Sequence, residues 1–153
     1  MNQHPVHVQS LLVPLDGSRA AESALAWAEE LAGKHQSEII LLRVGREPNI
    51  LEVRDIDDLK AFMQRDEEDC RSYLQQVKLR LKSAAFVKVR LEYCLGNPGP
   101  AIVRKAAELG ASLIVMASHG RDGMARWWLG SVAERVTRHA ACPVLLVRQA
   151  DQA

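Results

Sequence analysis

The sequence is poor in cysteine. It contains only Cys70, Cys94 and Cys142, an odd number of residues that lie far apart in the chain. No C-x-x-C spacing occurs, which argues against the zinc sites and redox pairs built on that motif. We therefore expect three reduced and mostly buried thiols, and no metal site.

Long apolar runs and an excess of one charge are also missing. No stretch approaches the roughly 20 apolar residues of a membrane span, and the segment from Met1 to Gln9 has no hydrophobic signal core. Lys and Arg total 20 against 19 Asp and Glu, a formal net charge of +1. These features predict a cytoplasmic protein that has no membrane or nucleic-acid partner.

The chain has 153 residues, enough to bury a core, so we expect a single domain over residues 1–153. Short apolar runs alternate with stretches whose apolar residues recur every three or four positions, which predicts alternating strands and helices. The expected strands are 11–15, 39–44, 87–95, 113–117 and 144–147. The expected helices are 18–33, 55–81, one between the break at 97–100 and Gly110, and one over 131–140.

Alternating strands and helices imply right-handed crossovers, and hence an α/β fold in three layers with a five-stranded parallel sheet and helices on both faces. The runs 11–15, 39–44 and 113–117 are apolar on both faces, as interior parallel strands are. The strand at 87–95 alternates between apolar and polar residues, which is typical of a half-exposed edge. If the first strand is central, the strand order is 3-2-1-4-5.

The last strand, Val144–Val147, is then the other edge, although it is apolar on both faces. An open apolar edge favours aggregation unless it is covered. We expect a homodimer in which this strand pairs with its copy across a two-fold axis. The alternative is that the C-terminal tail or a helix covers the strand.

A ligand of an open parallel sheet binds beyond the carboxyl ends of the strands, where the strand order reverses. Here the reversal brings together residues 14–18 and 117–132, with Val44 beside them. The second segment contains Gly120 and Gly130, and it closes on a helix whose expected start is a capping box of Ser131 and Glu134. The standard phosphate motifs G-x-x-x-x-G-K-[ST] and G-x-G-x-x-G are both missing.

Two interpretations of this glycine-containing loop are open. Glycines and a helix N-terminus can hold a phosphate, with Arg121 and Arg126 supplying positive charge. The same glycines can instead simply permit the turn.

Three segments together resemble the universal stress protein family over about residues 9–148. They are Val13–Ser18, Met116–Gly120 followed by Leu129–Glu134, and Cys142–Val147. The ATP-binding members of that family carry the pattern G-x2-G-x9-G-[ST]. Gly120, Gly130 and Ser131 match it with the nine-residue spacing intact, while Ala117 stands at the position of the first glycine.

The resemblance implies a nucleotide site, ATP as its ligand with or without magnesium, and a dimer through the last strand. Asp16 and Val44 would face the adenosine, and the residues that follow the fourth strand would line the phosphates. The full implied set is Pro14, Asp16, Val44, Met116, Ala117, Ser118, His119, Gly120, Arg121, Gly130, Ser131 and Val132.

No catalytic residue is assigned. His119 fits a loop-ordering or phosphate-contact role better than acid–base chemistry, because the spacing offers no nucleophile or triad partner. Asp16 is equally suited to nucleotide contact and to capping the turn before the first helix. Trp127 and Trp128 could stack on a base or pack against the sheet or a partner.

Three functions follow from these features. The first is an ATP-binding stress or regulatory module that acts as a dimeric switch. The second is a dimeric interaction protein that binds no nucleotide, which Ala117 favours. The third is a slow ATPase, which would need Asp16 and His119 as its base and metal ligand.

Overall fold

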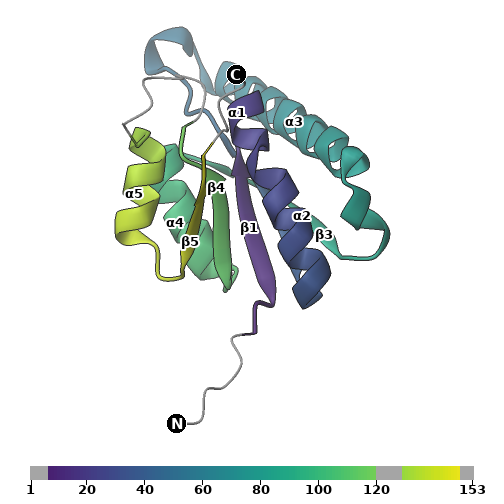
Figure 1. Cartoon of the computed structure of the whole chain (residues 1–153). Coiled ribbons are helices and arrows are strands. Elements are labelled where there is room, and N and C mark those ends of the chain that lie inside the picture. Colours follow the sequence, from purple (N-terminus) through teal and green to yellow (C-terminus); the bar gives the residue numbers. More distant parts are fainter. Residues whose placement is uncertain (1–6, 120–128, 149–153) are drawn as a thin grey trace, which may run out of the picture.

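A computed structural model describes residues 7–119 and 129–148 of the chain. Five parallel strands form one twisted sheet in the order β3-β2-β1-β4-β5, which confirms the predicted strand order (Figure 1). The strands are β1 (Ser10–Leu15), β2 (Glu38–Gly45), β3 (Val89–Leu95), β4 (Leu113–Ala117) and β5 (Val144–Val147).

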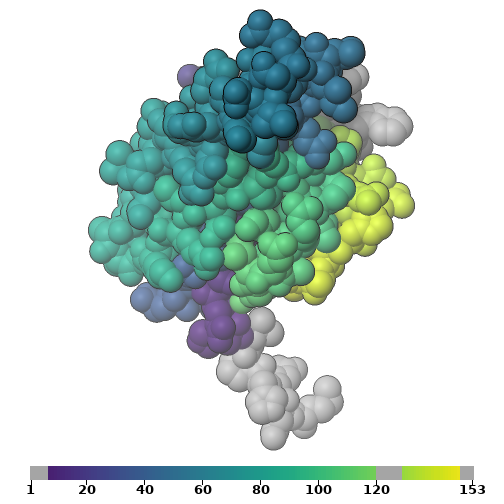
Figure 2. Space-filling view, turned by 180° about the vertical axis from the view of Figure 1, so that it is seen from behind, coloured from purple at the N-terminus to yellow at the C-terminus, as the bar shows by residue number. Residues whose placement is uncertain are grey.

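Helices cover both faces of the sheet, as predicted. On one face lie α1 (Arg19–Glu22), α2 (Ala24–His35) and α3 (Ile56–Arg80), and on the other α4 (Pro98–Glu108) and α5 (Ser131–His139). Two short 3-10 turns, η1 (Ile50–Glu52) and η2 (Lys82–Ala85), flank α3. In Figure 2 α4 (green) and α5 (yellow) lie side by side on their face of the sheet.

The sheet separates two apolar cores. Leu11, Val13, Ile39 and Leu41 face the α1, α2 and α3 side, and alternate residues such as Leu12 face the α4 and α5 side. These side chains are at most 1% exposed, as expected of interior parallel strands. The edge strand β3 is only half-buried over most of its length, also as predicted.

The first helical stretch differs from its prediction. It consists of two helices, because Ser23 breaks the run and its hydroxyl donates to the Ala20 carbonyl at 2.6 Å. The second of them passes through Gly33 and ends at His35, and its C-cap Gln36 adopts the left-handed conformation with φ of 54°. Gly33 is therefore a helix-interior residue and not the predicted stop.

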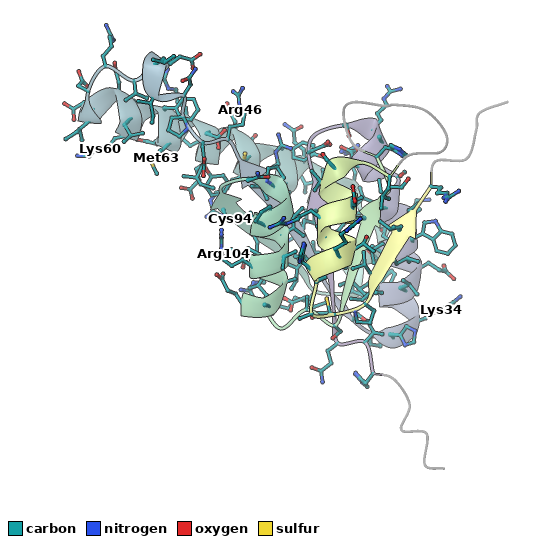
Figure 3. The ribbon with its side chains drawn as sticks, turned by 90° about the vertical axis from the view of Figure 1, so that its left-hand side faces the viewer. Lys34, Arg46, Lys60, Met63, Cys94 and Arg104 are labelled. Atoms are coloured by element: carbon teal, nitrogen blue, oxygen red, sulfur yellow. The ribbon has the colours of Figure 1, made fainter. Side chains whose placement is uncertain are left out.

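Helix α3 has 25 residues. Its first turns, with Lys60 and Met63, project beyond the body of the protein (Figure 3). Its second half packs through Cys70, Leu74 and Val77.

The three cysteines are free thiols, as predicted. Only Cys70 is fully buried, whereas Cys94 and Cys142 are half-buried. Burial raises the pKa of all three thiols. Within residues 7–119 and 129–148, no helix is long and apolar enough to cross a bilayer.

Candidate functional site

The turn after β1 presents Asp16 at the carboxyl edge of the sheet, the upper edge in Figure 1. The Ser18 amide donates to Asp16 Oδ1 at 2.8 Å, and Ser18 Oγ accepts from the Ala21 amide at 3.1 Å as the N-cap of α1. Gly17, between them, has φ of 85°, a conformation that glycine adopts without strain. Asp16 thus caps the turn through Oδ1.

The end of β4 lies beside this turn, because β4 pairs directly with β1. Ala117 is 8% exposed and stands opposite Val147 of β5. Ser118 continues that ladder, since its amide donates to the Val147 carbonyl at 2.9 Å. The position of the first family glycine is therefore strand backbone, where alanine fits.

His119 follows at the same edge. Its Nδ1 lies 3.1 Å from Ser118 Oγ. Its Nε2 is buried and has no hydrogen-bond partner among the described residues. A buried nitrogen of this kind costs free energy until water, protein or ligand satisfies it.

Gly130 connects the end of β4 to α5. Its amide donates to the Ser118 carbonyl at 2.9 Å. A Cβ at this position would lie 3.1 Å from the same carbonyl oxygen and 3.5 Å from His119 Cα. Its φ is −60°, so the close approach of two backbone segments, and not a left-handed conformation, favours glycine here.

The predicted capping box is wrong. Gly130 is the N-cap of α5, and Ser131 is the first helical residue. The reason is the bond from Gly130 to Ser118, which fixes Gly130 in an extended conformation just before the helix. Glu134 pairs instead with Arg138 at 2.9 Å. The exposed Ser131 hydroxyl is consequently not used as a cap.

The start of α5 has the properties of an anion site. The first amides of a helix have no acceptor within it, and they carry partial positive charge. Here these amides begin at Ser131, next to the segment Ser118–His119 to which Gly130 is bonded. Val132 is half-buried and packs against the second core.

The remaining predicted residues lie around the same edge. Pro14 is buried in β1 opposite Leu42, Met116 is buried in β4, and Val44 packs against the second core near the end of β2. Gly120 and Arg121 lie outside the described residues, as do Arg126, Trp127 and Trp128. The structure thus gathers all the other predicted site residues at one edge of the sheet.

Sequence analysis missed Arg43, a charged residue within the apolar run 39–44. Its Nη1 donates to the Leu15 carbonyl at 3.2 Å, directly before the Asp16 turn. Its guanidinium carbon lies 5.7 Å from the centroid of the Tyr73 ring. A single cation in a strand that is otherwise apolar was the available signal.

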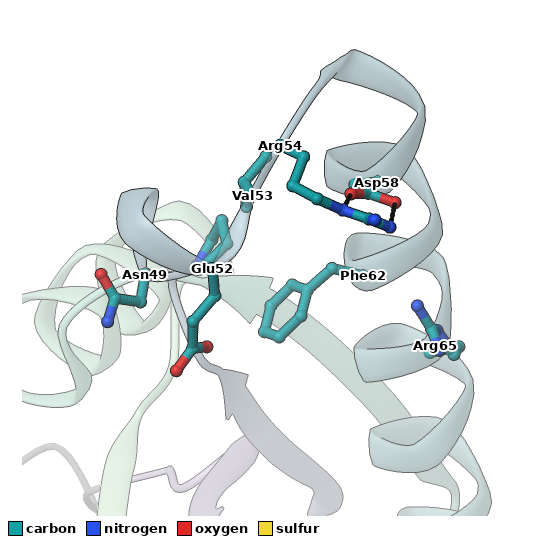
Figure 4. A pocket seen from close by; sticks show the side chains of 8 residues that line it. Asn49, Glu52, Val53, Arg54, Asp58, Phe62 and Arg65 are labelled. Atoms are coloured by element: carbon teal, nitrogen blue, oxygen red, sulfur yellow. Dashed lines mark hydrogen bonds and ion pairs between the residues drawn. The ribbon is translucent and has the colours of Figure 1, made fainter.

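Metal ligands do not gather in the described part of the chain, where no group of three or more His, Cys, Asp or Glu side chains could hold an ion. A separate hollow of about 230 Å³ lies between residues 48–54 and the start of α3 (Figure 4). The Phe62 ring lines it, and Arg54 bonds Asp58 there at 2.7 Å. None of its lining residues belongs to the predicted site.

Comparisons with known proteins identify the family of the chain. A model described as the universal stress protein family matches residues 7–148. The universal stress protein YxiE of Bacillus subtilis is 33% identical over an alignment of 145 residues, and the match covers 90% of this chain and 97% of that protein.

Two solved structures are similar. The hypothetical protein MJ0577 has a TM-score of 0.83 and 29% identity, and the match covers 96% of this chain and 100% of that chain. A universal stress protein in complex with cAMP has a TM-score of 0.70 and 23% identity, covering 94% of this chain and 99% of the other. At 23% identity, the match to the cAMP complex shows only that the two chains share a fold.

Proposed function

This chain belongs to the universal stress protein family, and on that premise we propose that it binds ATP at the carboxyl edge of its sheet as a dimeric stress-response or regulatory switch. ATP occupancy would change the shape of the protein or its choice of partner. The site would comprise the residues predicted from the sequence, with magnesium optional. A nucleotide ligand is consistent with the predicted cytoplasmic location.

One observation carries the proposal. Gly130 holds the start of α5 against the Ser118 carbonyl at 2.9 Å, so the first amides of that helix lie beside the segment that follows β4. The buried Nε2 of His119 at this place has no partner among the described residues. Several donors therefore converge where a phosphate group would bind.

The substitution at Ala117 is compatible with this proposal. Ala117 lies in the β4–β5 ladder and does not have a positive φ, so its backbone does not require glycine. Its methyl group is also the observation that favours the second candidate, a dimeric interaction protein that binds no nucleotide. Slow ATP hydrolysis would be a third activity, with Asp16 and His119 as its candidate residues.

The dimer is proposed to form through β5. That strand pairs only with β4 within the described ranges 7–119 and 129–148. Three of its four residues, Val144, Leu145 and Leu146, are only half-buried although all are apolar. Antiparallel pairing with a second copy would satisfy the outer backbone groups and cover these side chains. Sedimentation showing a monomer at micromolar concentration would contradict this part of the proposal.

The test is thermal unfolding with and without magnesium–ATP, and with GTP as the comparison nucleotide. A ligand at about a hundred times its Kd stabilises the native state by about 2.7 kcal/mol, which raises the midpoint by several degrees in a domain of this size. We expect such a rise with ATP and not with GTP. An unchanged midpoint with ATP would support the nucleotide-independent candidate instead.

Two variants locate the effect. Gly130→Val places methyl groups against the Ser118 carbonyl, and the rise with ATP should disappear. Gly33→Ala, in which the added Cβ meets only Phe86 Cε2 at 3.7 Å, should keep the full rise. An ATP effect that survives in Gly130→Val would place the ligand elsewhere.

A further inference from the structure

Arg43 holds the backbone directly before the turn that carries Asp16. Arg43 Nη1 donates to the carbonyl of Leu15, the residue directly before Asp16, at 3.2 Å. The guanidinium is itself fixed by the Tyr73 ring of α3, with 5.7 Å between the guanidinium carbon and the ring centroid. At that separation a cation and an aromatic face attract each other.

Helix α3 also holds α1, the helix that follows the turn. Glu22 of α1 accepts from Tyr73 Oη at 2.9 Å and from Arg80 Nη2 at 3.1 Å. Burial, and then the Glu22 carboxylate, raise the pKa of Tyr73, and Asp16 adds to this effect. Tyr73 thus links the residues on both sides of the Asp16 turn.

The turn needs such support. Helix α1 spans only Arg19–Glu22, too few residues to be stable through its own hydrogen bonds. Gly17, with φ of 85°, lies in the middle of the turn and is the residue type with the greatest conformational freedom. Contacts from outside the turn therefore help to hold its backbone, and with it the bond between the Ser18 amide and the Asp16 carboxylate.

We propose that Arg43 and Tyr73 are positioning residues that orient Asp16 for adenosine recognition. Arg43 fixes the backbone before the turn, and Tyr73 fixes both Arg43 and Glu22. Neither side chain needs to touch the nucleotide. The ligand part of this inference rests on the proposed ATP site, whereas the orientation of Asp16 can be measured without a ligand.

The first measurement is amide hydrogen exchange in the protein without nucleotide. The Ser18 amide donates to Asp16 Oδ1 at 2.8 Å, so its exchange rate reports the position of that carboxylate. Arg43→Met, which keeps an unbranched apolar stem and removes the guanidinium, should speed exchange at Ser18 by about tenfold, the equivalent of one hydrogen bond involving a charged group. Tyr73→Phe should act in the same direction, and Arg43→Lys should restore part of the protection.

A matched control is present in the same helix. The Arg71 guanidinium carbon lies 5.9 Å from the centroid of the Tyr93 ring, and Arg71 pairs with Glu67 at 2.7 Å. Arg71→Met removes a comparable arginine–tyrosine contact away from the Asp16 turn, and it should leave the Ser18 amide unchanged. Should Arg43→Met fail to unfold cooperatively, Tyr73→Phe and Arg43→Lys decide the same question.

The second measurement is a double-mutant cycle for ATP affinity. If Arg43 acts through Asp16, Arg43→Met weakens binding by about tenfold in the wild-type background and has no further effect in Asp16→Ala. A merely structural role would weaken binding to the same extent in both backgrounds.

The outcomes separate the two proposals. Unchanged exchange at Ser18 in both Arg43→Met and Tyr73→Phe overturns the positioning role, whatever ATP does. Additive effects of Arg43→Met and Asp16→Ala overturn it as well. If exchange at Ser18 is faster in Arg43→Met and Tyr73→Phe but the wild-type protein binds no ATP, the orientation of Asp16 by Arg43 is supported and the proposed ATP site is refuted.

Discussion

Replacing Gly45 with alanine would put a methyl group where two other side chains already lie. Gly45 ends β2 and is buried. An added Cβ would overlap Oδ2 of Asp66, and it would lie 2.6 Å from Tyr93 Cε2 and 2.7 Å from the Tyr93 hydroxyl. These two side chains are joined by a hydrogen bond of 2.9 Å from the hydroxyl to the carboxylate. At least one of the two side chains must therefore move, which disrupts the hydrogen bond between α3 and β3.

The expected loss of stability has two sources. Extra volume in a packed site costs about 1–3 kcal/mol. The hydrogen bond from Tyr93 to the carboxylate of Asp66 is worth about 1.5–3 kcal/mol. We expect the variant to lose only part of this free energy, because both side chains are half-buried and water can replace the lost bond. Gly45→Ala should thus destabilise the protein by about 3 kcal/mol, and lower the melting midpoint by about 6–12 °C.

The assay is urea or thermal unfolding of Gly45→Ala beside Gly33→Ala. Gly33 is in a helix interior, and its added Cβ would meet only Phe86 Cε2 at an ordinary 3.7 Å. Gly33→Ala should therefore stabilise by about 0.5–1 kcal/mol. A loss under about 1 kcal/mol for Gly45→Ala, or equal effects of the two variants, would refute the reasoning.

Three further results are expected. Ser18→Ala removes the N-cap of α1 and should cost about 1 kcal/mol, measured as a lower unfolding midpoint. Gly130→Ala, whose Cβ would lie 3.1 Å from the Ser118 carbonyl, should weaken ATP binding in calorimetry with a small loss of stability; unchanged affinity would contradict this. Tyr73 and Tyr93 are the two tyrosines of the chain, and burial with a carboxylate hydrogen bond raises the pKa of both. Their raised pKa favours the neutral hydroxyl in the folded state, so this stabilisation is fully present below the unfolded pKa of about 10 and is lost as pH rises from there through the raised pKa. Absorbance at about 295 nm should therefore show tyrosinate at pH of about 10.5 only after unfolding.

The fold was largely predictable because its signals are local. The apolar runs that became β1, β2 and β4 are buried on both faces, and this property appears directly in the sequence. The strand order followed from the crossover rule once β1 was central. Helix ends were less predictable, because contacts between side chains and backbone decide them. The break at Ser23 depends on a bond to Ala20, and Gly33 stays helical.

The sequence brought together residues that the fold places at one edge of the sheet, but it did not predict all of their geometry. The spacing of Ser131 and Glu134 suggested a capping box, yet a bond between Gly130 and the distant Ser118 carbonyl sets the helix start. Arg43 was hidden within an apolar run, and only the folded chain places it beside Leu15 and Tyr73. Both features depend on tertiary contacts that a linear pattern does not carry.

The most direct test of the account is an amide NMR titration of the labelled protein with ATP. The proposed site predicts saturable shifts at Asp16, Ser118, His119 and the first residues of α5. Two results would contradict the central claim that the carboxyl edge of this sheet binds an adenine nucleotide. One is a set of shifts confined to the separate hollow at Arg54 and Phe62 (Figure 4). The other is the absence of any shift at millimolar ATP.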